Sequence, residues 1–256
     1  MARIVDILRS RLPGGGRSLF RHDPVPRIYA IGDIHGRYDL LTQLLHRIEA
    51  HKDSLPPAAS TYLIFLGDYV DRGPDSCRVV AILRKLSELH RNVICLAGNH
   101  DDMMVRVMRN NHIALRAWLR MGGDATLESY GVAVAGMGEA ALMGEAHRCV
   151  PKEHVEWLAG LPISVRLGGY FFCHAGIRPG VSLRRQGRDD MLWIREDFLE
   201  DDRRHECVVV HGHSMESEVQ IRANRIGVDT GAYRTGILSA ICLEGARQDV
   251  IATGPS

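Results

Sequence analysis

The N-terminal part of the chain repeats one pattern three times: an apolar run ends in a polar turn, and a helical segment follows. The apolar runs are residues 27–31, 61–66 and 92–96, and their β-branched and aromatic side chains predict buried strands. Leucine, isoleucine and valine recur at helical spacing in residues 38–50 and 79–89, which predicts a helix after each of the first two strands. Successive strand–helix units have right-handed crossovers and build a largely parallel sheet.

Composition and charge limit the classes of function. The chain has 256 residues, of which 45% are hydrophobic and 25% charged, as expected for a globular protein with one good-sized core. A formal net charge of +1 gives no electrostatic reason to expect a nucleic-acid or membrane partner. No apolar run approaches the roughly 20 residues that span a bilayer. The six cysteines are scattered without a CxxC pair, which predicts reduced thiols in a cytoplasmic protein.

Polar residues stand where the predicted strands end. Two later apolar runs, residues 170–173 and 207–210, also end in histidine-containing turns. The carboxyl ends of parallel strands form the ligand-binding edge of a sheet. A mixture of carboxylate, amide oxygen and imidazole suits manganese, iron or zinc, and there are too many donors for one tetrahedral ion. We therefore predict a two-metal site, with Asp68 as the natural bridge, from Asp33, His35, Asp68, Asn99, His174 and His213.

Five motifs occur in order along the chain: GDIHG, GDYVDRG, GNHD, HAG and GHS. With these motifs the sequence resembles the calcineurin-like metallophosphoesterase superfamily. More narrowly, it resembles the Ser/Thr phosphoprotein phosphatase family and its bacterial and phage members. The resemblance covers roughly residues 27 to 245 and implies an α/β fold. In that fold a central β-sandwich of two mixed sheets is flanked by helices, in four α/β/β/α layers.

The domain organisation is predicted from the same resemblance and from local pattern. Residues 27–256 form the catalytic domain, with a helical insertion near the site at about residues 103–160. Residues 1–26 form an N-terminal extension, and residues 1–12 have the pattern of a short amphipathic helix.

The resemblance also implies roles for single residues. One metal would be held by Asp33, His35 and Asp68, and the other by Asp68 with the remaining predicted ligands, Asn99, His174 and His213. The implied cofactors are two divalent ions, first of all manganese, with iron or zinc as alternatives.

Catalytic and phosphate-binding residues are implied in the same way. His100 matches the general acid that protonates the leaving alkoxide, and Asp71 the acid that orients it. Arg72 matches a phosphate-binding arginine, Arg195 resembles a second one, and Asn99 also faces the phosphate. The nucleophile is a metal-bridging hydroxide, so no phosphoenzyme is expected.

Three functions follow, and we rank them. The first is hydrolysis of phosphate monoesters, with phosphoserine or phosphothreonine of a phosphoprotein or phosphopeptide as substrate. The second is a symmetrical dinucleoside tetraphosphate hydrolase, favoured by GNHD and by Ala97, where some family members have arginine. The third is a non-catalytic metal-binding scaffold. The final position of the GHSM segment is Met215, where many relatives have a histidine ligand.

The other histidines and one aspartate are assigned to structure. We expect His211 to be a strand residue. Asp229 could cap a turn or touch the site, and we favour the turn. The histidines without a partner pattern are predicted to lie on the surface: His22, His46, His51, His90, His112, His147, His154 and His205.

Overall fold

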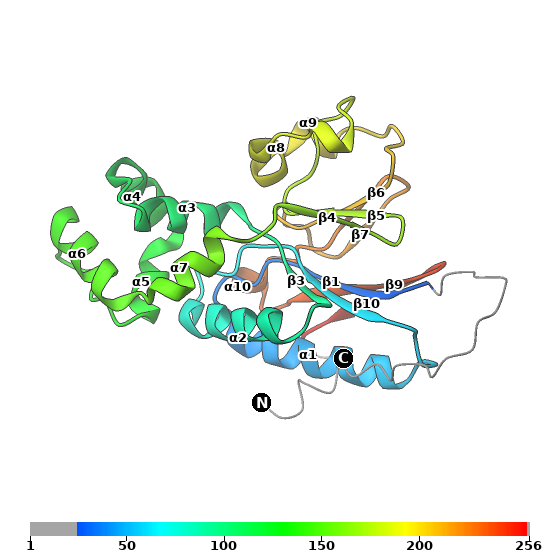
Figure 1. Ribbon diagram of the computed structural model, residues 1–256, viewed down its shortest axis with the longest axis horizontal. Coiled ribbons are helices and arrows are strands. Elements are labelled where there is room, and N and C mark those ends of the chain that lie inside the picture. The colour runs from blue at the N-terminus through cyan, green and yellow to red at the C-terminus, as the bar shows by residue number, and fades with distance from the viewer. Residues whose placement is uncertain (1–24, 255–256) are drawn as a thin grey trace.

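Two five-stranded mixed sheets lie face to face at the centre of the computed structural model, which describes residues 25–254 (Figure 1). The first sheet has the order β10-β9-β1-β2-β3. Its strands β1, β2 and β3 are parallel, as predicted, whereas β9 and β10 run antiparallel to their neighbours. The strands are β1 Arg27–Ile31, β2 Thr61–Phe65, β3 Val93–Cys95, β9 Ser239–Glu244 and β10 Arg247–Ala252.

The second sheet has the order β4-β5-β6-β8-β7. Its central strands β5, β6 and β8 are parallel, and β4 and β7 close the two edges as antiparallel strands. The strands are β4 Ser164–Leu167, β5 Tyr170–Cys173, β6 Val208–His211, β7 Gln220–Ile221 and β8 Arg225–Gly227.

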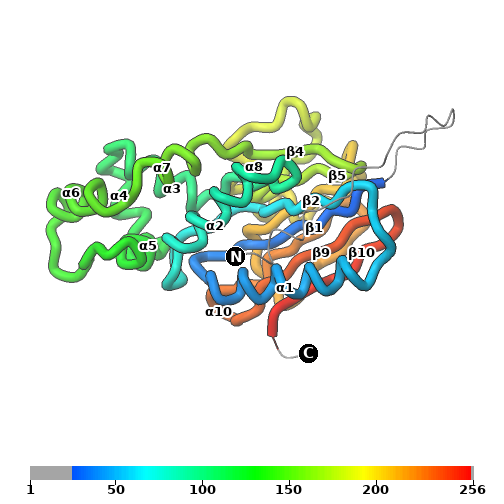
Figure 2. Tube along the Cα trace, turned by 60° about the horizontal axis from the view of Figure 1, so that its bottom comes forward, coloured from blue at the N-terminus to red at the C-terminus, as the bar shows by residue number. Residues whose placement is uncertain are grey.

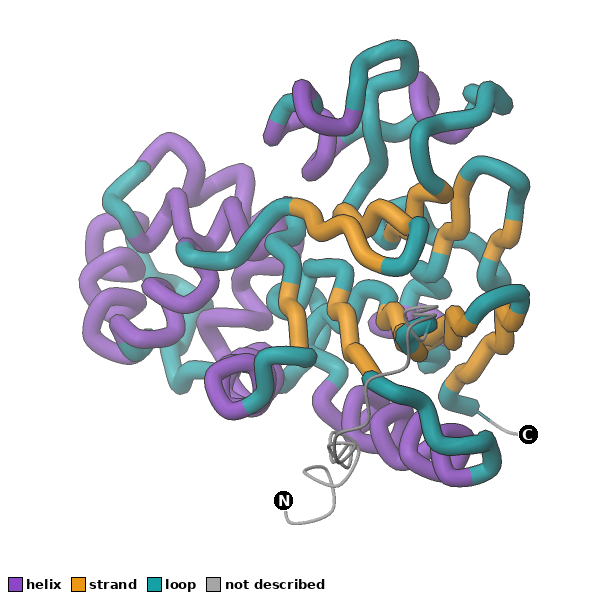
Figure 3. Tube along the Cα trace, turned by 45° about the vertical axis from the view of Figure 1, so that its right-hand side comes forward, coloured by secondary structure: helices purple, strands orange, loops and turns teal. Residues whose placement is uncertain are grey.

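Helices cover the outer faces of both sheets, which gives the predicted four layers (Figure 1, Figure 3). Helices α1 (Tyr38–Asp53) and α2 (Ser76–Leu89) lie under the first sheet. Helices α8 (Arg188–Trp193) and α9 (Glu196–Leu199) lie over the second, after a 3₁₀ turn at Leu183–Arg185. The short helix α10 (Ala232–Thr235) lies near the start of α1 (Figure 2).

Three apolar clusters fill the spaces between these layers. One joins α1 and α2 to the first sheet and continues into the helical lobe, and it includes Leu44, Phe65 and Trp118. The second lies between the sheets, and the third packs the second sheet against α8 and α9 around Phe198. A continuous hydrophobic filling of this kind fixes the strand ends relative to one another.

Residues 103–160 are mostly helical, as predicted, and form a lobe at one end of the two sheets (Figure 1). The lobe begins with α3, which starts at the GNHD motif, and it includes a π-helical turn at Leu119–Gly123. Its helices are α3 Asn99–Met108, α4 His112–Trp118, α5 Asp124–Ser129, α6 Glu139–Cys149 and α7 Lys152–Ala159.

Some predictions differ from the structure. The prediction that His154 is a surface residue is wrong: it is only 6% exposed, and its Nδ1 lies 2.9 Å from the Tyr130 hydroxyl. The sequence pattern also missed the C-terminal hairpin strand β10, because its first three residues are polar and only its last three are apolar, which leaves no long apolar run. The predicted helix at residues 1–12 and His22 lie outside the described residues. Among residues 25–254, no helix is long and apolar enough to cross a membrane.

Candidate metal centre and active site

The turns after the strands gather at one edge of the sandwich, and their backbones are unusual. Left-handed φ angles between 45° and 75° occur at His35, Asp68, Asp71, Arg72 and His213. Residues other than glycine rarely adopt this conformation, and such positions cluster at functional sites. Among the described residues only one other non-glycine position, Asn110, shares it. Local backbone strain is thus concentrated at the residues that the sequence motifs single out.

One group of atoms that could bind a metal ion lies around Asn99. Its Oδ1 is 2.8 Å from His174 Nε2 and 3.0 Å from His213 Nδ1, and His174 Nε2 is 3.5 Å from Asp68 Oδ1. His174 Nδ1 lies 2.9 Å from the carbonyl oxygen of Leu66, which only accepts, so Nδ1 carries the proton. In the neutral imidazole Nε2 then presents a lone pair to the Asn99 oxygen at 2.8 Å. Two acceptor atoms at this distance are suited to bind one cation together.

A second group lies around His35. Its Nδ1 is 2.8 Å from the carbonyl oxygen of Val70, so Nδ1 carries the proton and Nε2 is the acceptor atom of the ring. His35 Nε2 is 3.5 Å from Asp68 Oδ2, and His100 Nε2 is 3.9 Å from the same oxygen. The two oxygens of Asp68 therefore face different groups, one toward His174 and one toward His35.

The carboxylate of Asp33 lies beside the group around Asn99, with its Oδ1 3.9 Å from His174 Nδ1. Both of its oxygens accept a hydrogen bond from the backbone amide of His213, at 3.0 and 3.2 Å. Gly212 makes this approach feasible, because a Cβ at this position would lie 2.1 Å from Asp33 Oδ1. The six predicted ligands thus come together at one buried site, and each is no more than 7% exposed.

The charges of these residues favour cation binding. Burial disfavours the charged form of Asp68, but the surrounding imidazoles, His174 first, outweigh it and lower the pKa of its carboxyl group. Burial lowers the pKa of His35 to about 3 and that of His213 to about 2, so both imidazoles are neutral, as metal ligands are. Burial and the nearby carboxylates of Asp229 and Asp68 raise the pKa of Asp33. A site of crowded carboxylates and neutral imidazoles fits divalent cations.

His100 and Asp71 form a buried pair beside these donors. His100 Nδ1 lies 2.7 Å from Asp71 Oδ2, which leaves Nε2 facing the cavity. Burial lowers the pKa of His100, but the carboxylates of Asp68 and Asp71 more than compensate, and the pKa is raised from its ordinary value. Burial raises the pKa of Asp71 despite its contact with His100.

Arg72 reaches across both groups. Its Nη1 lies 2.9 Å from His35 Nε2, and its Nη2 lies 3.0 Å from His100 Nε2. The guanidinium carbon is 4.5 Å from the centre of the Tyr233 ring. A planar cation is thus held directly beside the imidazoles of His35 and His100.

The cavity above the site has a volume of about 350 Å³ and a mixed lining. Besides Arg72, the predicted residue Arg195 lines it and is exposed. Trp193 and Tyr233, 38% and 36% exposed, also line it, although the sequence patterns did not single them out. Ala97 is buried and is not part of the lining, and its backbone amide donates to the carbonyl oxygen of Pro162.

Asp229 has both of the roles that the sequence left open. Its Oδ1 accepts a hydrogen bond from the amide of Gly231 at 2.8 Å, so it caps the predicted turn. It is also 6% exposed and lines the cavity, where burial raises its pKa to about 6.

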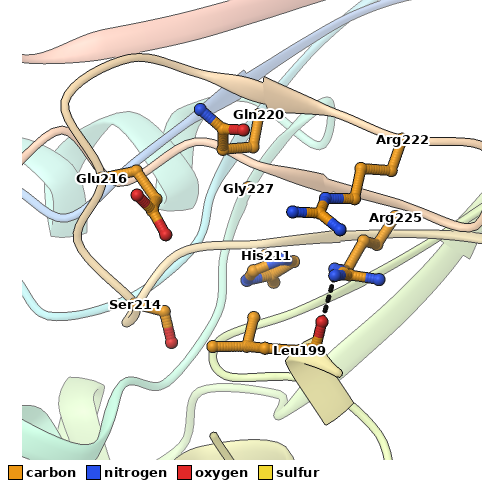
Figure 4. Close-up of a pocket in the computed structure, with 8 residues that line it drawn as sticks. All are labelled: Leu199, His211, Ser214, Glu216, Gln220, Arg222, Arg225 and Gly227. Atoms are coloured by element: carbon orange, nitrogen blue, oxygen red, sulfur yellow. Dashed lines mark hydrogen bonds between the residues drawn. The ribbon is translucent and has the colours of Figure 1, made fainter. Parts of the chain in front are cut away.

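A smaller pocket lies behind the loop that carries His213 (Figure 4). Residues of this loop alternate: His213 and Met215 line the main cavity, whereas Ser214 and Glu216 line the second pocket. His211 lies in the middle of this second pocket, buried, which agrees with its prediction as a strand residue (Figure 4). The pocket is closed on one side by the Arg225 side chain, which donates to the Leu199 carbonyl oxygen.

The calcineurin-like phosphoesterase family matches residues 26–236 of this chain. The chain belongs to that family. It is accordingly a hydrolase that acts on phosphoric esters, and the family match agrees with the resemblance carried by the five motifs.

Curated relatives are named as a protein phosphatase or as bis(5'-nucleosyl)-tetraphosphatases. The "Serine/threonine-protein phosphatase 2" of Escherichia coli is 27% identical over 226 residues, which cover 83% of this chain and 90% of the relative. "Bis(5'-nucleosyl)-tetraphosphatase PrpE [asymmetrical]" of Bacillus mycoides is 24% identical over 82% of this chain and 88% of the relative. A symmetrical tetraphosphatase of Janthinobacterium is 28% identical over 71% of this chain, but the match spans only 63% of that enzyme's length.

Solved structures confirm the fold. A protein provisionally described as a diadenosine tetraphosphatase superposes with a TM-score of 0.64 and 22% identity, over 91% of this chain and 96% of its own. A cold-active protein tyrosine phosphatase superposes with a TM-score of 0.56 and 17% identity, over 89% and 78%.

Proposed function

We propose that this protein hydrolyses phosphate monoesters with two divalent metal ions and with His100 as the general acid. The observation that supports this most strongly is the arrangement around Asp68. One of its oxygens faces His35 and the other faces His174, and the His100–Asp71 pair stands beside them. This arrangement supports a role for His100 as proton donor to a phosphate ester bound at two metal ions.

The donor atoms described above fit two cations. Asp33, His35 and Asp68 would hold the first ion, and Asp68, Asn99, His174 and His213 would hold the second. Manganese is the first choice, with iron or zinc as alternatives, because the set mixes oxygen and nitrogen donors. When bound, two such ions supply an activated water molecule and neutralise charge on the phosphoryl oxygens.

The chain's own residues then bind the phosphate and supply a proton. Arg72 and Arg195 line the cavity and would offer guanidinium groups to the non-bridging phosphoryl oxygens, and Asn99 lines the same cavity. Asp71 accepts from Nδ1 of His100. When Arg72 turns from His100 Nε2 to the phosphate, the protonated Nε2 donates its proton to the leaving oxygen.

The substrate that best uses this arrangement is a phosphoserine or phosphothreonine side chain in a protein. An alkoxide is a poor leaving group, so its departure gains most from a positioned acid. The similarity to the E. coli serine/threonine-protein phosphatase 2 supports this assignment.

A dinucleoside tetraphosphate is the second candidate, and one feature of the cavity favours it. Trp193 and Tyr233 present half-exposed aromatic rings at the rim, where a nucleobase would stack. Relatives named as tetraphosphatases support this alternative.

A direct test compares the two substrates on manganese-loaded protein. One assay uses a phosphothreonine peptide, and the other a dinucleoside tetraphosphate at the same concentration. We expect a higher kcat/KM for the peptide. A higher kcat/KM for the dinucleotide would overturn the protein-phosphatase assignment in favour of the second candidate. No turnover of either substrate would contradict both.

A further inference from the structure

Two side chains of the helical lobe hold the carboxylate of Asp71. The indole Nε1 of Trp118 donates to both oxygens of Asp71, at 3.0 Å each. The hydroxyl of Thr126 donates to Asp71 Oδ1 at 2.7 Å. Trp118 and Thr126 are both fully buried, so water does not compete for the carboxylate. Neither residue belongs to a motif of the sequence, and both are more than 45 residues away from Asp71 along the chain.

The same contacts hold the backbone of Asp71. The Asp71 amide donates to the hydroxyls of Thr126 and Ser76, at 2.7 and 3.1 Å. Thr126 therefore bridges the amide and the carboxylate of one residue. Asp71 has a φ of 75°, a conformation that costs free energy for a residue other than glycine and persists only when its surroundings impose it.

The backbone of the helical lobe also contacts the segment that carries Asp71. Its π-helical turn at Leu119–Gly123 presents the carbonyl oxygen of Gly122 to the amide of Arg72 at 3.1 Å. Gly123 packs flat against Trp118, and a Cβ at this glycine would lie 2.5 Å from the indole ring. The turn thus fixes the indole and the segment of residues 71–72 together.

From these contacts we propose that Trp118 and Thr126 are positioning residues for proton transfer to the leaving group. They hold Asp71 so that its Oδ2 accepts from Nδ1 of His100, which fixes the imidazole with Nε2 toward the substrate oxygen. In the reaction the bond between phosphorus and the leaving oxygen breaks while a water oxygen bonds to phosphorus. The leaving oxygen takes the proton of His100 Nε2. The attacking water loses one proton to solvent, and His100 Nε2 regains one proton from solvent. This inference rests on the proposed function of His100.

The consequence is selective for the leaving group. An alkyl phosphate needs the proton of His100, whereas 4-nitrophenolate leaves as a stable anion without it. Loss of either positioning residue should therefore slow hydrolysis of alkyl esters and spare hydrolysis of aryl esters. Damage to the metal centre or to the fold would slow both reactions alike.

The experiment measures kcat for a phosphothreonine peptide and for 4-nitrophenyl phosphate with four metal-loaded variants. Trp118→Phe and Thr126→Val each remove one donor, and Thr126→Ser keeps the hydroxyl. Trp157→Phe is the matched control, because the Trp157 indole donates to Ser87 Oγ at 3.1 Å in the same lobe but away from the site. Metal content and the midpoint of thermal unfolding are measured for every variant.

We expect Trp118→Phe and Thr126→Val to lower kcat on the peptide about tenfold and kcat on the aryl ester less than about twofold. Thr126→Ser and Trp157→Phe should leave the ratio of the two rates unchanged. Because Trp118 acts through His100, Trp118→Phe should cause no further loss on the peptide in a His100→Asn background.

Three results would overturn this inference. Equal losses on the two esters would show that the residues only support the fold, and unchanged rates would show that they have no part in the reaction. Full additivity with His100→Asn would show that they do not act through it. These results differ from failure of the proposed function itself, in which the wild-type protein hydrolyses neither ester. If Trp118→Phe does not fold, the Thr126→Val and Thr126→Ser pair decides the question.

Discussion

The two sides of the active-site cavity are built differently. On the side of the helical lobe, His100 and Asp71 are at most 2% exposed and every polar atom of the Asp71 side chain has a partner in the chain. On the side of helix α8, Trp193 and Arg195 are exposed and face the cavity. The first side is preorganised for proton transfer, whereas the second side offers exposed groups that can contact different substrates.

This difference explains why the chemistry of the site is easier to assign than its substrate. His100 is buried and its Nδ1 is bonded to Asp71, so only its Nε2 can donate a proton to a substrate. An exposed aromatic ring and an exposed guanidinium contact a peptide or a nucleotide with similar ease, because both substrates offer apolar faces beside a phosphate.

The largest effect should come from Asp68, which belongs to both groups of donors. Asp68→Asn removes the charge that faces His35 on one side and His174 on the other. We expect loss of bound manganese and a fall in kcat of about a thousandfold, since each metal contributes several kcal/mol to the reaction. Metal content by elemental analysis and turnover of the same sample are measured together. Retention of two ions per chain would contradict the shared role of Asp68.

Substitutions of the two arginines should have smaller effects on kcat/KM, and the two effects should differ in size. Arg72 is held by two imidazoles and the Tyr233 ring, whereas Arg195 is exposed at the rim. A preorganised guanidinium loses less freedom on binding a phosphate. We expect Arg72→Ala to lower kcat/KM about a hundredfold and Arg195→Ala about tenfold or less. Steady-state kinetics on one peptide give both values, and the reverse order would contradict the comparison of the two sides.

The smallest effect should be one of substrate preference. Trp193→Ala removes a ring of the open side and leaves the buried side intact. We expect a change of about threefold to tenfold in KM for a dinucleoside tetraphosphate, from the loss of base stacking, and little change for a small phosphopeptide. Arg222→Ala, in the second pocket, is the matched control, because this side chain does not line the main cavity. Equal changes in KM for both substrates would remove Trp193 as a determinant of preference.

The sequence predicted the side of the site that lies at strand ends. Asp33, Asp68 and Asn99 each follow one of three parallel strands in the same sheet, so local pattern and sheet geometry suffice to bring them together. Because these residues also belong to short motifs, the sequence further predicts that they are metal ligands.

Contacts from the helical lobe could not be predicted in this way. Trp118 and Thr126 meet Asp71 only through tertiary packing, and a tryptophan or a threonine in a helical segment is ordinarily assigned to the core or the surface. His154 is a similar case, because its hydrogen bond to Tyr130 depends on how α7 packs against the end of α5. Single-sequence periodicity does not contain such long-range contacts.

The most direct test of the central claim is the turnover of His100→Asn on two esters with different leaving groups. The variant should retain both metal ions and the fold, because asparagine removes only the proton donor. We predict that its kcat on a phosphothreonine peptide falls by about a hundredfold to a thousandfold, while its kcat on 4-nitrophenyl phosphate falls by about tenfold or less. Equal rates of wild type and variant on the peptide would contradict the assignment of His100 as the general acid.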